Sequence, residues 1–148
     1  MNIFFRSMIK DDIDKILDIE KKAFPDPWTR EMFYSELLVE GSVFQTACIK
    51  NNDEEIIVGY AGCRYFESCA EILNLAVDAQ YRLKGIGKKI LSRILDILNE
   101  KGVKNVFLEV RESNTAAKKL YGDMGFSIIN VRKKYYSNPE EDALILKK

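Results

Sequence analysis

Residues 72–89, with the sequence ILNLAVDAQYRLKGIGKK, decide the fold of this chain. The run Ile72–Val77 is apolar except for Asn74, as in a central strand that is covered on both faces. After a short polar stretch, Gly85 and Gly87 open a segment in which isoleucine and leucine recur at helical spacing, and a Lys-Gly pair closes it. The sequence therefore predicts a buried strand, a glycine-containing loop and a long helix.

This helix leads to a second apolar strand over Val106–Val110. In a strand-helix-strand unit of this kind the two strands are parallel and the crossover is right-handed, whereas the rest of the chain is predicted to pair antiparallel. The other expected elements are strands over 3–8, 43–50, 56–66, 126–136 and 142–146 and helices over 10–23, 29–39 and 113–124. Together they predict one α/β (α+β) domain over residues 1–148, with helices on both faces of a mixed, mostly antiparallel sheet of six to seven strands.

Composition excludes several classes of function. Lys and Arg number 23, as do Asp and Glu, so the chain lacks the basic excess of a general nucleic-acid binder. It has no histidine, which rules out a Ser-His-Asp triad, a Cys-His pair and any zinc site that needs histidine. The cysteines, Cys48, Cys63 and Cys69, form no C-x-x-C pair, and no segment reaches the ~18 apolar residues of a membrane span. We therefore expect a cytoplasmic protein with reduced thiols, no metal and no membrane partner.

The loop over 82–89 has the chemistry of an anion site. It follows a buried strand and opens a helix, and the first N–H groups of a helix have no partners within it. Together with the helix dipole these groups attract a phosphate. Arg82, Lys84, Lys88 and Lys89 add positive charge. A pyrophosphate would fit this loop, although a glycine-containing turn with a solvated basic helix start would show the same residues.

Two common phosphate loops do not match. A Walker A loop needs G-x-x-x-x-G-K-[ST], but Lys88 is followed by Lys89 and Arg82 stands in place of the first glycine. A dinucleotide fingerprint needs a third glycine, where this chain has Ile90. The remaining pattern, R-x-x-G-x-G after a strand that ends Leu-Ala-Val-Asp, is similar to the coenzyme A loop of the GNAT acetyltransferases.

A second cluster of polar residues lies between 108 and 121. Glu109 stands in a strand that is otherwise apolar, and a desolvated carboxylate has a raised pKa, which suits a general base. Asn114 is placed to cap the next helix, and Tyr121 follows two turns later on the same side. An ordinary cap and a core aromatic residue would account for Asn114 and Tyr121 equally well.

Together the two clusters resemble the GNAT family, in particular its bacterial ribosomal-protein-alanine N-acetyltransferases of the RimI type. The resemblance covers nearly the whole chain and departs at Leu83-Lys84, where relatives often carry polar residues. It rests on Ala23-Phe24-Pro25, Pro27-Trp28, Leu75–Asp78, Arg82–Gly87, Leu108–Arg111, Ser113-Asn114, Leu120-Tyr121, Gly125-Phe126, Tyr135-Tyr136 and Glu141–Ala143.

The resemblance implies a GNAT-like fold and acetyl-CoA as the donor. Glu109 would be the general base and Tyr121 the general acid. Main-chain groups of the strand would bind the pantetheine arm, the loop would bind the pyrophosphate, and the helix cap would contact the cofactor. The implied cofactor-binding residues are Leu75, Ala76, Val77, Arg82, Leu83, Lys84, Gly85, Ile86, Gly87, Lys88 and Asn114.

The resemblance also implies the acceptor, the N-terminal amine of an alanine-starting small-subunit ribosomal protein. Trp28, Tyr135 and Tyr136 would bind this peptide, and a set of acidic residues could attract it if it is basic: Glu36, Glu40, Glu140, Glu141 and Asp142. We expect a monomer or weak dimer that makes no direct contact with nucleic acid.

Three alternatives stay open at this point. The acceptor could be another protein N-terminus, a lysine side chain, a polyamine or a small amine. The protein could be a non-catalytic acyl-CoA-binding module, which the presence of both Glu109 and Tyr121 disfavours. It could also be a nucleotide-binding protein, which the incomplete glycine patterns disfavour.

Overall fold

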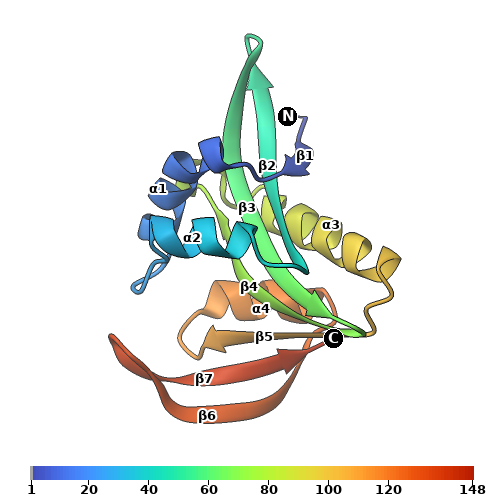
Figure 1. The fold of residues 1–148 in the computed structure, drawn as a ribbon. Coiled ribbons are helices and arrows are strands. Elements are labelled where there is room, and N and C mark those ends of the chain that lie inside the picture. The colour runs from blue at the N-terminus through green and yellow to red at the C-terminus, as the bar shows by residue number, and fades with distance from the viewer. Residues whose placement is uncertain (1) are drawn as a thin grey trace.

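Seven strands form one sheet in the order β1-β2-β3-β4-β5-β7-β6 in the computed structural model, which describes residues 2–148 (Figure 1). The strands are β1 (Phe4–Ser7), β2 (Ser42–Asn51), β3 (Glu54–Phe66), β4 (Cys69–Val77), β5 (Asn105–Arg111), β6 (Ser127–Ser137) and β7 (Glu140–Lys147). The helices are α1 (Ile13–Ala23), α2 (Arg30–Leu37), α3 (Ile86–Glu100) and α4 (Thr115–Asp123), with 3₁₀ turns η1 (Lys10–Asp12) and η2 (Ala79–Tyr81). Of these pairs only β4 and β5 are parallel, which confirms the predicted fold class.

Helices cover both faces of the sheet because each has one apolar side. In α3 the side chains of Ile86, Ile90, Ile94 and Leu98 recur every four residues and are almost fully buried. They pack with α4 against one face of the sheet. On the other face, α1 and α2 pack together around Ile16 and other buried side chains. The predicted helix over 29–39 ends earlier, at Leu37, because the chain turns there toward Gly41, which has a φ of +87°.

The pairing of β4 with β5 is short. Only three residue pairs join them, between 69–71 of β4 and 105–107 of β5. Beyond that point the two strands diverge, and β5, β7 and β6 run at a steep angle to β2 and β3 (Figure 1). A bulge in β4 leaves Leu73 without a partner on β3, since Ile72 pairs with Cys63 and Asn74 with Gly62. The divergence and the bulge fall at the same level of the sheet. At this level the edges of β4 and β5 are not paired with each other, so a ligand could bind to them.

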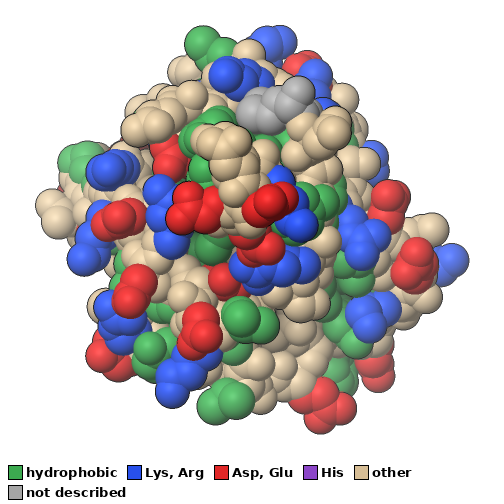
Figure 2. Space-filling model, turned by 90° about the horizontal axis from the view of Figure 1, so that it is seen from above, with side chains coloured by type: hydrophobic (Ala, Val, Ile, Leu, Met, Phe, Trp, Pro, Cys, Tyr) green, Lys and Arg blue, Asp and Glu red, His purple; other side chains and the backbone are tan. Residues whose placement is uncertain are grey.

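The surface has a mixed charge. Figure 2 shows acidic and basic side chains interspersed on the face seen from above. Among residues 2–148 there is no helix with the length and apolar character needed to cross a bilayer.

Candidate functional site

The predicted anion site lies at the start of α3. Gly85 precedes the helix with a φ of +78°, and a Cβ at that position would meet no atom within 4 Å. The first bond of the helix runs from the Lys89 N–H to the Gly85 carbonyl at 3.2 Å. The N–H groups of Ile86, Gly87 and Lys88 precede this bond, so they are available to a ligand. The loop therefore has the donors that a diphosphate needs.

The side chains around this loop do not all point to it. The Arg82 Nε donates to the Val77 carbonyl at 3.1 Å, so this guanidinium supports the end of β4. Lys84 lies over the Tyr81 ring, with 5.9 Å between the ammonium and the ring centroid. Leu83 has a φ of +62° and is fully exposed. Arg82 and Lys84 thus make contacts within the protein, and their part in phosphate binding stays a prediction.

Helix α4 lies against the start of α3. The Leu120 Cδ2 is 3.5 Å from the position that a Cβ on Gly87 would take. Asn114 caps α4, because its Oδ1 accepts the Ala117 N–H at 3.1 Å. The Tyr121 ring is 8% exposed and packs edge-on against Phe126, with 5.6 Å between ring centroids. Burial raises the pKa of Tyr121 to about 12, so the phenol carries its proton at neutral pH.

Glu109 lies on the opposite side of the sheet from Tyr121. Its neighbours Leu108 and Val110 belong to the core beneath α3 and α4, and side chains alternate along a strand. The Glu109 side chain is 25% exposed, and its Oε1 lies 3.5 Å from Nη1 of Arg132. The Glu109 carboxylate is therefore only partly desolvated, and its role as the general base stays a prediction. The point where β4 and β5 diverge lies between the two residues.

Residues from two other strands gather around Glu109. Burial and the charge of Glu109 both raise the pKa of Glu71 on β4, so these carboxylates share one face of the sheet. The charge of Glu109 is also the largest cause that raises the pKa of Tyr135 on β6. The rings of Tyr135 and Tyr136 are 5.2 Å apart. The structure thus brings both predicted tyrosines to the proposed base, and it adds Glu71, which the sequence interpretation missed.

Trp28 occupies a different environment. Its ring lies 5.1 Å from Phe33 and 6.2 Å from Phe44, between centroids, and so belongs to the core under α2. The main-chain N–H of Trp28 donates to Oε2 of Glu20 at 2.9 Å. Glu20 is 2% exposed and also accepts the hydroxyl of Tyr60. The Trp28 indole therefore supports the loop between α1 and α2 by packing, and its contact with a substrate stays a prediction.

Glu20 and Arg111 are the other residues that sequence reasoning missed. Glu20 follows Ile13 and Ile16 on the buried side of α1. A carboxylate at the helical spacing of buried apolar residues is a signal from which its burial could be predicted. Burial raises the pKa of Glu20. The sequence shows Arg111 only as the last residue of the Leu-Glu-Val-Arg motif, but its side chain bonds to two separate segments, the loop at Asp26 and the β6–β7 turn. No sequence pattern links positions so far apart.

Most of the acidic residues that could attract a basic acceptor are paired within the protein. Glu36 is buried and pairs with Arg64. Glu141 pairs with Arg111, and Asp142 pairs with Lys133 at 3.2 Å. Three of the five predicted acidic residues therefore have basic partners within the protein.

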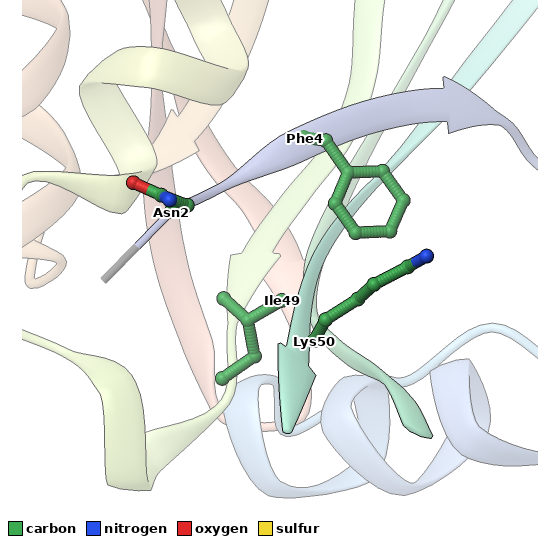
Figure 3. A pocket seen from close by; sticks show the side chains of 4 residues that line it. All are labelled: Asn2, Phe4, Ile49 and Lys50. Carbon is green, nitrogen blue, oxygen red and sulfur yellow. The ribbon is translucent and has the colours of Figure 1, made fainter. Parts of the chain in front are cut away.

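A surface hollow elsewhere does not contribute to this site. It is lined by Asn2, Phe4, Ile49 and Lys50, at the outer edge of the sheet (Figure 3). Strands β3 and β4 separate this edge from β5. Within the described part of the chain no three His, Cys, Asp or Glu side chains gather as metal ligands would.

The family follows from a comparison with known proteins. Residues 13–126 match the model of the acetyltransferase (GNAT) family. The chain belongs to this family of acetyltransferases. Its fold is that of a solved archaeal structure, Ard1 from Thermoplasma volcanium, at a TM-score of 0.89, 24% identity and coverage of 100% of this chain and 97% of the other.

Within the family, the chain is similar to enzymes named for one acceptor. A Haemophilus ducreyi protein named [ribosomal protein bS18]-alanine N-acetyltransferase is 32% identical over 143 residues, which cover 95% of each chain. The Escherichia coli protein of the same name is 31% identical over 137 residues, 91% of this chain and 89% of the relative. The crystal structure of the ribosomal-protein-S18-alanine N-acetyltransferase from Escherichia coli has a TM-score of 0.87 at 30% identity and covers 99% of this chain and 92% of that one.

Proposed function

We propose that this protein transfers the acetyl group of acetyl-CoA to the N-terminal α-amine of a ribosomal protein that begins with alanine. One observation carries the proposal: β4 and β5 diverge at the level where Glu109 faces one side of the sheet and Tyr121 the other. This geometry lets a thioester on one side meet an amine on the other. The names of the relatives at 31–32% identity support the choice of acceptor.

Acetyl-CoA supplies an activated acetyl thioester, and the residues around the divergence suit it. The N–H groups of residues 86–88 at the start of α3 would bind the diphosphate. Beyond residue 71, β4 no longer pairs with β5, so the main chain of Leu75–Val77 could bond to the amides of the pantetheine arm as a neighbouring strand does. Asn114 already uses its side-chain oxygen as a helix cap, which leaves its amide NH₂ to contact the cofactor.

The chemistry requires a neutral amine. An N-terminal amine has a pKa of ~7.7–8.0, against ~10.4 for a lysine side chain, so less assistance is needed to deprotonate it. Glu109 would accept the proton, directly or through a water, as the nitrogen forms its bond to the acetyl carbon. A main-chain N–H near Val77 would polarise the acetyl carbonyl. As the carbon–sulfur bond breaks, Tyr121 would donate its hydroxyl proton to the departing thiolate.

The acceptor peptide would lie between the loop over 24–28 and the β6–β7 hairpin. Tyr135 is 49% exposed beside Glu109, so its hydroxyl could bond to the first peptide groups of the acceptor. Cys48, Cys63 and Cys69 are free thiols, which suits the cytoplasm, where acetyl-CoA and ribosomal proteins would meet. That the protein acts as a monomer or weak dimer stays a prediction.

The test is acetyl transfer to matched peptides. We expect transfer to a peptide with a free N-terminal alanine, weaker transfer to serine or methionine versions, and none to the acetyl-blocked version. Mass spectrometry of peptides that also carry an internal lysine would distinguish the two amines. Preferred transfer to the lysine or to a polyamine would reject the acceptor. Tight binding of acetyl-CoA without transfer to any amine would instead indicate an acyl-CoA-binding module.

A further inference from the structure

Arg111 joins the loop over 24–28 to the β6–β7 hairpin, and the space between these segments, where the acceptor peptide is proposed to lie, is called the acceptor groove here. Its Nη2 lies 3.0 Å from Oδ2 of Asp26, in the loop between α1 and α2. Its Nη1 donates to the Pro139 carbonyl at 2.9 Å and to Oε1 of Glu141 at 3.1 Å, at the β6–β7 turn. In Figure 1 this loop and this turn lie on the same side of the molecule, beside the end of β5. The guanidinium therefore spans the groove at one end.

The guanidinium is fixed in place by its surroundings. The side chain is 12% exposed, and the guanidinium carbon lies 4.3 Å from the centroid of the Tyr136 ring. Glu141 uses its other oxygen, Oε2, to accept the Ser113 N–H at 2.8 Å. Ser113 and Arg111 together hold the pKa of Glu141 below its usual range. The contacts thus continue from Asp26 through Arg111 and Glu141 to the segment just before α4.

The contacts of the Arg111 side chain connect surface segments and lie outside the hydrophobic core. Arg111 is two residues from Glu109 in β5 and faces the same side, away from the core under α3 and α4. Its partner Asp26 lies in a segment without regular structure, 85 residues away in sequence. A planar guanidinium suits such a task because it bonds in several fixed directions at once. Without it, the carboxylates of Asp26 and Glu141 would lose their shared counter-ion.

We propose that Arg111 is a positioning residue that holds the loop over 24–28 against the β6–β7 turn and so sets the width of the acceptor groove. The proposal rests on the proposed function, since it concerns the acceptor of that reaction. The side chain of Arg111 contacts Asp26, the β6–β7 turn and the Tyr136 ring, none of which is a proposed cofactor-binding residue, so its direct effect falls on the peptide. The groove is then formed before the peptide binds, which lowers the ordering cost of binding.

The test compares variants of Arg111 in steady-state kinetics. For Arg111→Gln we expect the KM for an alanine-starting peptide to rise about tenfold, the size expected from losing a charge-assisted hydrogen bond. The Kd for acetyl-CoA and the kcat at saturating peptide stay close to wild type. Arg111→Lys keeps the charge but not the planar fork, so it restores only part of the loss. Adding Asp26→Asn to Arg111→Gln causes little further loss, because the two residues act through one contact.

Arg6→Gln is the matched control. Arg6 also bridges two carboxylates, Asp12 at 2.7 Å and Glu55 at 2.6 Å, but at the opposite end of the sheet. We expect it to lower stability and leave the KM for the peptide unchanged. An unchanged peptide KM in Arg111→Gln would overturn the proposal, as would an equal rise in Arg6→Gln, because the effect would then reflect general destabilisation.

Hydrogen exchange separates this inference from the proposed function. If the wild type acetylates no N-terminal peptide, the proposed function fails, but the contact across the groove can still be tested. Arg111→Gln should then speed amide exchange both in residues 24–28 and in residues 137–141, whereas Arg6→Gln should not. Faster exchange in both segments supports the positioning role, and unchanged exchange in either segment overturns it.

Discussion

Replacing Tyr121 by phenylalanine tests the proposed proton donor with little change to the fold. The ring is 8% exposed and packs edge-on against Phe126, and phenylalanine keeps both the ring and this contact. We therefore expect the free energy of unfolding to change by less than about 1 kcal/mol. Only the hydroxyl, and with it the proton that would reach the thiolate, is removed.

The size of the effect follows from two pKa values. Burial raises the pKa of Tyr121 to about 12, whereas a free thiol has a pKa of ~8.5. Full proton transfer from this phenol to a free thiolate is therefore unfavourable. Proton transfer from Tyr121 would therefore be only partly advanced in the transition state, as charge develops on the sulfur. Its contribution should then lie at the lower end of general acid catalysis, and its removal should lower kcat about 100-fold.

The assay is single-turnover acetyl transfer combined with calorimetry of acetyl-CoA binding. The expected result for Tyr121→Phe is a slower chemical step with an unchanged Kd for acetyl-CoA. The phenol keeps its proton up to about pH 12. The wild-type rate should therefore not fall as the pH rises to ~10, a range in which an amine with a pKa of ~7.7–8.0 is mostly neutral. Unchanged turnover in the variant would refute the reasoning, and a weakened Kd would show that Tyr121 serves cofactor binding instead.

Three further predictions concern the base, a buried carboxylate and the core. Glu109→Gln should move the pH optimum of kcat/KM upward, because the amine must then lose its proton without help; an unaltered pH profile would argue against Glu109 as the base. Burial raises the pKa of Glu20 above its usual 4.5, so the stability that the neutral carboxyl contributes is lost as the pH rises through the pKa in the folded state. Glu20→Gln should therefore make the free energy of unfolding, measured in urea, depend less on pH. An unchanged dependence on pH would contradict the prediction. Gly62→Ala would bring a Cβ to 2.1 Å from the Phe44 ring and should lower the free energy of unfolding by about 1–3 kcal/mol; a wild-type midpoint in denaturant would show that the ring can move aside.

The elements of the fold were predictable because their signals are local. The apolar run in β5, the helical spacing in α3 and the Asn114 cap lie within single segments of sequence, and each was found at the expected place. Boundaries shifted by a few residues where chain turns decide them, as at Gly41. The start of α3 was predictable because Gly85 is a signal within the same segment of sequence.

The surroundings of the site were less predictable because they depend on contacts between distant segments. The exposure of Glu109 depends on which face of β5 a helix covers, and the sequence of β5 does not contain that information. The contact between Arg111 and Asp26 joins positions 85 residues apart. The packing of the Trp28 ring on Phe33 and Phe44 likewise depends on how the loop over 24–28 folds onto the core, which the sequence does not show.

The short pairing between β4 and β5 gives the molecule two parts that meet along a narrow join. One part holds β1–β4 with α1, α2 and α3, and the other holds β5–β7 with α4. Three residue pairs, the core under α3 and the Arg111 contacts connect them. Local opening should therefore separate β5–β7 as one cooperative unit before β1–β4 open. The proposed base and acid, Glu109 and Tyr121, lie on either side of this join, so its stiffness would control how constant the distance between amine and thioester remains from one turnover to the next.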